Sequence, residues 1–172
     1  MKLLKNIIFI FLIIAFSSCK STFFNNGKSI SQQAADYNDL IINQQIAIVG
    51  TIDILAESFK EYIPEKMDEA LNNAINQTNK SIEYLNGLEN FYKNSEFKDG
   101  ALILFNVYKS VLEYEYKEMV EIYKLSDMEF TEEHSKKFDE FSALANYRTD
   151  IAFKEFVDIQ DKFAKKYELI LY

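Results

Sequence analysis

The chain has 172 residues, of which 48% are hydrophobic and 27% are charged, and its formal net charge is −8 at pH 7. This composition provides the apolar surface of a globular domain and excludes disordered, collagen-like and disulfide-rich proteins. The acidic balance argues against nucleic acid as a partner, because its phosphates would repel the protein. One cysteine and one histidine cannot build a zinc or iron–sulfur ligand set, so we expect no metal and no cofactor.

The first eighteen residues have the layout of a secretory signal peptide. Lys2 and Lys5 precede an apolar run over residues 7–16, and two small residues, Ser17 and Ser18, follow it. The run, about ten residues long, is shorter than the ~20 residues that a transmembrane helix needs. We therefore predict a signal peptide over residues 1–18 rather than a permanent span.

The only cysteine of the chain, Cys19, comes directly after these serines. The string Phe16-Ser17-Ser18-Cys19 resembles the lipobox of bacterial lipoproteins, except that Phe stands where the motif usually has Leu. The resemblance implies cleavage before Cys19, attachment of fatty acids such as palmitate to its thiol, and acylation of the new amine. The alternative is an ordinary cleaved signal peptide followed by a free thiol.

Acylation would decide where the protein resides. Each buried methylene contributes about 0.8 kcal/mol, so two or three acyl chains would hold the protein to a membrane. Lys20 follows Cys19 in place of Asp, which by analogy with lipoprotein sorting permits transfer to the outer membrane of a bacterial cell envelope. Residues 19–28 would form a short tether, and both the periplasmic and the surface face stay open.

Residues 29–172 predict one all-α domain of four helices, because apolar residues recur every three or four positions in four segments. The first helix starts near Ile30 and ends before Pro64, which begins a second helix that reaches about Tyr92. The third covers about residues 95–125. The fourth runs from Thr131, a candidate N-cap, to about Glu168.

Short connections between long helices predict how these segments pack. Helices of about 30 residues span ~45 Å, and each must run back along its predecessor. We therefore predict an antiparallel up-down-up-down four-helix bundle, with a three-helix bundle and a loosely docked first helix as the alternative. The apolar face of the third helix is broad, so a homo-oligomer formed through it also stays open.

Three short strings support a family resemblance. Residues 35–42 (ADYNDLII), 130–133 (FTEE) and 163–167 (FAKKY), together with the lipobox, resemble a poorly characterised family of bacterial surface-type helical lipoproteins. The strings carry no catalytic chemistry. The resemblance therefore implies a helical fold and a membrane location over most of the chain, and no activity.

Patterns that could carry chemistry have simpler structural interpretations. His134 has Thr131, not Glu, three residues before it, so the di-iron motif is missing and we expect a solvated first-turn residue. Methionines that could ligate haem usually fill cores instead: Met67, Met119 and Met128. An acidic series spreads over more than one helix face among lysines, as a solvated surface does: Glu113, Glu115, Glu118 and Glu121.

Arg148, the only arginine, lies on the apolar stripe of the fourth helix, where a charge needs a partner. If the first and fourth helices are antiparallel, Asp53 lies at the right height. We predict a structural ion pair between Arg148 and Asp53. The functional alternative is an arginine that binds an anionic small molecule in a central cavity.

Three functional hypotheses follow from these observations. The first is a non-enzymatic interaction or structural module that presents a helical face to a protein partner at the membrane. Tyrosine is enriched in interfaces, and the chain has several that could form such a face: Tyr114, Tyr116, Tyr123 and Tyr147. The second is a small-ligand-binding lipoprotein with a cavity near Arg148. The third is an enzyme, which would need a reactive group that the sequence does not display.

Overall fold

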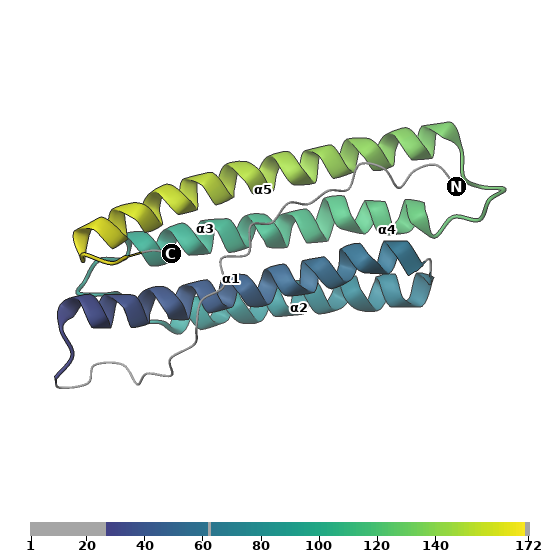
Figure 1. The fold of residues 1–172 in the computed structure, drawn as a ribbon. Helices are drawn as coiled ribbons and strands as arrows, with labels where there is room; N and C mark the ends of the chain where they lie inside the picture. The colour runs from purple at the N-terminus through teal and green to yellow at the C-terminus, as the bar shows by residue number, and fades with distance from the viewer. Residues whose placement is uncertain (1–26, 62, 171–172) are drawn as a thin grey trace.

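The computed structural model describes residues 27–61 and 63–170, and all regular secondary structure in these residues is helical. The predicted signal peptide, Cys19 and most of the predicted tether lie outside the described residues. The helices lie side by side along the length of the molecule (Figure 1).

The elements are α1 (Ile30–Glu61), α2 (Pro64–Gly87), α3 (Glu96–Val111), the π-helical turn η1 (Leu112–Tyr116), α4 (Lys117–Tyr123) and α5 (Glu132–Lys166). Since α3, η1 and α4 follow one another without a gap, they form one long helix, and the prediction of four helices is confirmed. The predicted end of the second helix at Tyr92 is wrong. That helix ends at Gly87 because Leu88 is already extended, and a turn closes where Asn94 N donates to Phe91 O at 2.8 Å.

The prediction that α5 begins after an N-cap at Thr131 is confirmed. The Thr131 hydroxyl accepts a hydrogen bond from His134 N at 3.4 Å, and His134 Nδ1 accepts one from Thr131 N at 3.2 Å. Glu132 and Glu133 occupy the first turn, where carboxylates favour the positive end of the helix dipole. His134 lies in the first turn as expected, but its ring forms half of a capping box and is not simply solvated.

Removal of this cap gives a measurable loss of stability. We expect Thr131→Ala to lower the free energy of unfolding by about 1 kcal/mol, because the backbone N–H of His134 loses the hydroxyl oxygen that accepts its hydrogen bond. Urea unfolding monitored by circular dichroism measures the change. Thr131→Ser, which keeps the hydroxyl, serves as the control, and an equal loss in both variants would contradict the assignment.

The first helix contributes to the common core. Among its buried side chains, Tyr37, Ile41, Ile48, Leu55 and Phe59 belong to the same cluster as the buried residues of α2, α3 and α5. Gln160 Nε2 donates to Asn38 Oδ1 at 2.8 Å and thereby links α5 to α1. These contacts argue against a loosely docked first helix.

The segment Ile30–Lys60 is also long and apolar enough to cross a membrane, by length and composition alone. Such a segment is compatible with a membrane anchor, but a core helix of a soluble domain meets the same criteria. The buried stripe of α1 explains part of its apolar character. The rest lies on the outer side of the helix, where Ile46 and Ile54 are exposed.

An aromatic cluster packs the helices together at the end of the molecule where α1 begins. Phe163 of α5 lies at its centre, with ring centroids 6.0 Å from Tyr37 of α1, 5.6 Å from Phe91 and 4.7 Å from Phe97 of α3. At the opposite end, the ring centroid of Phe59 of α1 lies 5.2 Å from that of Tyr123 of α4 and 5.9 Å from that of Phe138 of α5. Side chains from three helices therefore depend on one another in each cluster.

Burial also changes the ionisation of two tyrosines in the core. Desolvation raises the pKa of Tyr108 and of Tyr116 from 10.0 to about 12 in each case. Well below pH 10 both phenols are neutral in the folded and the unfolded state, and their ionisation costs no stability. Between pH 10 and 12 the unfolded chain ionises first, so stability falls by up to about 2–3 kcal/mol per tyrosine.

Single substitutions isolate this effect from the titration of lysines. We expect Tyr116→Phe to lose less stability than the wild type between pH 9 and pH 11.5, as measured by urea unfolding at both pH values. The matched control is Tyr114→Phe, because Tyr114 is 67% exposed on the same helical segment. Equal alkaline losses in the two variants would show that the burial of Tyr116 does not control its ionisation.

Candidate functional site: the outer surface of α3 and α5

The single arginine of the chain bridges α5 and the third helical segment. Arg148 Nη1 donates to Glu115 Oε1 at 2.5 Å, and Nη2 donates to Ser110 Oγ at 2.7 Å. The Arg148 side chain is 32% exposed and that of Glu115 is 6% exposed. The guanidinium therefore lies at the edge of the core with its two terminal nitrogens bound to the protein.

The predicted pairing of Arg148 with Asp53 is wrong. Asp53 is exposed on α1, where desolvation and the nearby Glu57 raise its carboxyl pKa. Arg148 instead lies on the side of α5 that contacts α3. The periodicity of α5 placed Arg148 on a buried stripe but did not determine which neighbour that part of the stripe contacts.

Glu115 departs from the prediction that the acidic series is a solvated surface. Its neighbours in the acidic series behave as predicted, because Glu113 pairs with Lys109 at 3.8 Å and Glu121 with Lys124 at 2.8 Å. Glu115 is buried instead, and its Oε2 has no hydrogen-bond partner among the described residues. The signal was its spacing from Leu112 and Met119, three and four residues away, which places it on the apolar stripe.

Glu115 also lies within η1, the π-helical turn. Insertion of such a turn widens a helix locally and shifts the side chains that follow it, and π-turns recur at functional sites. Here the turn lies where the ion pair joins α5.

The methionines weighed as haem ligands occupy different environments. Met67 and Met119 are buried in the core, whereas Met128 is 95% exposed in the connection between α4 and α5 and fills no core position. No group of three or more His, Cys, Asp and Glu side chains within residues 27–170 is placed to hold a metal ion.

An apolar surface surrounds Arg148 on the outside of the molecule. Tyr114 lies one turn after Ser110, and Leu144 and Ile151 lie one turn before and after Tyr147 and Arg148. We call this surface the α3–α5 seam and define it by its exposed apolar side chains: Ile103, Tyr114, Leu144, Tyr147 and Ile151. Of the four tyrosines expected in an interface, Tyr114 and Tyr147 belong to it, whereas Tyr116 is buried and Tyr123 packs on Phe59.

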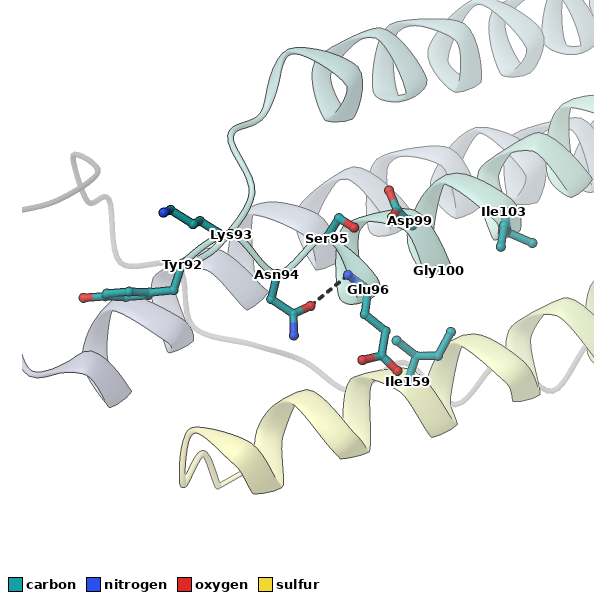
Figure 2. Close-up of a pocket in the computed structure, with 9 residues that line it drawn as sticks. All are labelled: Tyr92, Lys93, Asn94, Ser95, Glu96, Asp99, Gly100, Ile103 and Ile159. Carbon is teal, nitrogen blue, oxygen red and sulfur yellow. Dashed lines mark hydrogen bonds between the residues drawn. The ribbon is translucent and has the colours of Figure 1, made fainter.

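One end of the seam opens into a hollow of about 640 Å³ beside Gly100. A Cβ atom at Gly100 would lie 2.8 Å from Ile159 Cδ1, so α3 and α5 approach closely at this point. Figure 2 shows Glu96 directed toward Ile159, whereas Tyr92 and Lys93 point away from it. The polar groups around the hollow therefore do not converge on one position, as they would in a preformed small-molecule site.

Comparisons with protein-family models, curated proteins and solved structures return no match. The resemblance to helical surface-type lipoproteins therefore stays a prediction.

Proposed function

We propose that the protein is a lipoprotein anchored through Cys19 in the outer membrane of a bacterial cell envelope, where it acts as a non-enzymatic interaction module for a protein partner. The anchor follows from the lipobox-like string before Cys19. The observation that carries the interaction role is the α3–α5 seam. There, Ile103, Tyr114 and Tyr147 are each more than half exposed around a structurally bound arginine.

The proposal includes an up-down-up-down bundle, and contacts between helices support it. Ser31 of α1 bonds to Glu168, which follows the end of α5, and Asn38 of α1 bonds to Gln160 within α5. Residue numbers therefore rise along α1 in the direction in which they fall along α5. In α3 and α5, Gly100 lies beside Ile159 and Ser110 bonds to Arg148, so the numbers again run in opposite directions. At the two ends of α2, Asp68 bonds to Lys124, which follows α4, and Leu88 bonds to Lys98 of α3, with the same reversal of numbers. These three reversals support the antiparallel packing that the proposal requires.

Contact of exposed isoleucine and tyrosine side chains with water is unfavourable in free energy. Contiguous groups of such side chains are typical of protein interfaces. The alternative of a small ligand near Arg148 has less support, because both terminal nitrogens of the guanidinium already donate hydrogen bonds to Glu115 and Ser110. Three hollows on the surface of the described residues are lined by other side chains. An interaction surface accounts for the seam without any reactive group.

Co-isolation from native membranes tests the interaction. Tagged full-length protein is cross-linked reversibly in cells, extracted and purified, and the proteins that accompany it are quantified. The seam variant is Ile103→Asp/Ile151→Asp, and the matched control is Met128→Asp, because Met128 is 95% exposed in the connection between α4 and α5 and belongs to neither helix.

We expect a defined partner that the wild type and the control retain and that the seam variant loses at least tenfold. If the wild type retains nothing that the seam variant lacks, the proposed role of the seam is wrong. Circular dichroism of all three proteins establishes that a loss is not due to unfolding.

A further inference from the structure

We infer that the outer face of α1 and α2 lies against the membrane that holds the lipid anchor, so that the α3–α5 seam points away from the bilayer. This inference deepens the proposed function, because it rests on acylation of Cys19 and adds the orientation of the bundle. It assigns a lipid surface as the partner of a second, separate face of the molecule.

The face is defined by exposed side chains that carry no charge. On α1 these are Asn43, Ile46 and Ile54, of which Ile46 is 46% and Ile54 63% exposed, and Ile54 marks the edge of the face because the exposed Asp53 precedes it. On α2 they are Asn72, Asn73 and Asn76. We call this surface the α1–α2 face.

The distribution of charge makes this face unlike the rest of the molecule. No charged side chain occurs from residue 40 to residue 52, which is the longest uncharged stretch of the described chain, although 27% of all residues are charged. On α2 the stretch 70–79 is also uncharged. Ser81 Oγ donates to Gln44 Oε1 at 2.9 Å, which places the two stretches alongside each other.

Such a face suits the boundary of a bilayer. Partly exposed isoleucines can enter the region between headgroups and acyl chains, and asparagine amides can bond to headgroup oxygens. The acidic surfaces elsewhere on the protein would be repelled by anionic lipids, whereas an uncharged face avoids both repulsion and the cost of desolvating a charge. The apolar residues of Ile30–Lys60 would then contact the protein core on one side of α1 and lipid on the other.

The position of the anchor brings this face within reach of the bilayer. Ten residues lie between Cys19 and Ile30, and the eleven Cα–Cα steps from one to the other can span at most about 38 Å. Ile46 lies about 24 Å along α1 from its first residue. Because the anchor holds the face near the lipid at high effective concentration, a weak contact is sufficient to orient the bundle.

Figure 1 shows α1 and α2 on one side of the molecule and α5 on the other. Contact of the α1–α2 face with lipid therefore leaves Tyr147 and the rest of the seam accessible. The two faces would have separate roles, one toward the membrane and one toward the protein partner.

Tryptophan fluorescence tests this orientation directly, because the chain contains no tryptophan. Acylated full-length protein is produced in bacteria, extracted and reconstituted into nanodiscs with lipids brominated on their acyl chains. Single variants Ile46→Trp and Ile54→Trp report on the α1–α2 face. Tyr147→Trp, at a position that is 65% exposed on α5, is the matched control.

We expect brominated lipids to quench the two α1 variants at least twofold relative to unbrominated nanodiscs, and to leave the Tyr147→Trp variant unchanged. Equal quenching at all three positions, or quenching of the Tyr147→Trp variant alone, would overturn the inference. So would unquenched α1 variants in a protein that sedimentation shows to be a dimer, because a second copy would then cover this face.

The outcomes also separate this inference from the proposed function. Protein that carries no acyl chains and fails to join the nanodiscs would contradict the anchor itself. Protein that is acylated and bound to the nanodiscs, but whose α1 variants are unquenched, would contradict only the orientation.

Discussion

Arg148→Met is expected to lower the free energy of unfolding by about 3 kcal/mol, because it leaves the Glu115 carboxylate buried without its cation. One oxygen of that carboxylate, Oε2, already has no partner among the described residues, and the other would lose the bond to Arg148. An unpaired charge in this position must be desolvated without compensation. Urea unfolding at pH 7, monitored by circular dichroism, measures the loss.

The double variant Arg148→Met/Glu115→Leu serves as the control for this prediction. Removing both charges abolishes the penalty, and apolar replacements of buried ion pairs are often as stable as the pair. We expect the double variant to recover to within about 1 kcal/mol of the wild type. A single variant as stable as the wild type would mean that solvent screens the pair and that Glu115 is not held in the core.

Phe163→Ala is expected to have the largest effect of the substitutions considered, a loss of about 4 kcal/mol in the free energy of unfolding. The Phe163 ring lies within 6.0 Å of Tyr37 and within 4.7 Å of Phe97, and it also contacts Phe91 and Tyr167. Its removal would leave a cavity at the point where α1, α3 and α5 meet. Thermal and urea unfolding give the change in stability.

The matched control is Phe153→Ala on the same helix. Phe153 is 37% exposed, whereas Phe163 is 6% exposed. Substitution of a partly exposed ring removes less buried surface, and we expect a loss below about 1 kcal/mol. Comparable losses in the two variants would contradict a central role for the aromatic cluster.

The helices could be predicted because their signals are local. Pro64 fits the first position of α2, and the Thr131 hydroxyl fits the N-cap of α5. Both preferences depend on the local backbone and not on how the helices pack. The end of α2 was harder to predict. The turn after it places Tyr92 and Lys93 at φ of 46° and 65°, and neither residue type indicates a left-handed backbone as glycine or asparagine would.

The candidate site could be predicted only in part, because its geometry depends on how separate helices pack. The sequence identified Arg148 as a charge that needs a partner, but the choice between Asp53 and Glu115 depends on which helices are adjacent and on their register. The π-helical turn at Glu115 has no signal in the apolar periodicity. Which of the four candidate tyrosines line the seam could not be predicted, because exposure of Tyr147 and burial of Tyr116 follow from the packing of α5 on α3.

The mass of the mature protein tests the central claim, anchoring through Cys19, most directly. Full-length protein is expressed in a bacterium with its own lipoprotein-processing enzymes, extracted from washed membranes, and measured by intact-mass spectrometry beside a Cys19→Ala variant. The account predicts a chain of residues 19–172 that carries two or three fatty acyl chains, and a variant that is absent from the membrane fraction. An unacylated chain, or a Cys19→Ala variant that stays in the membrane with an unchanged distribution, would contradict it.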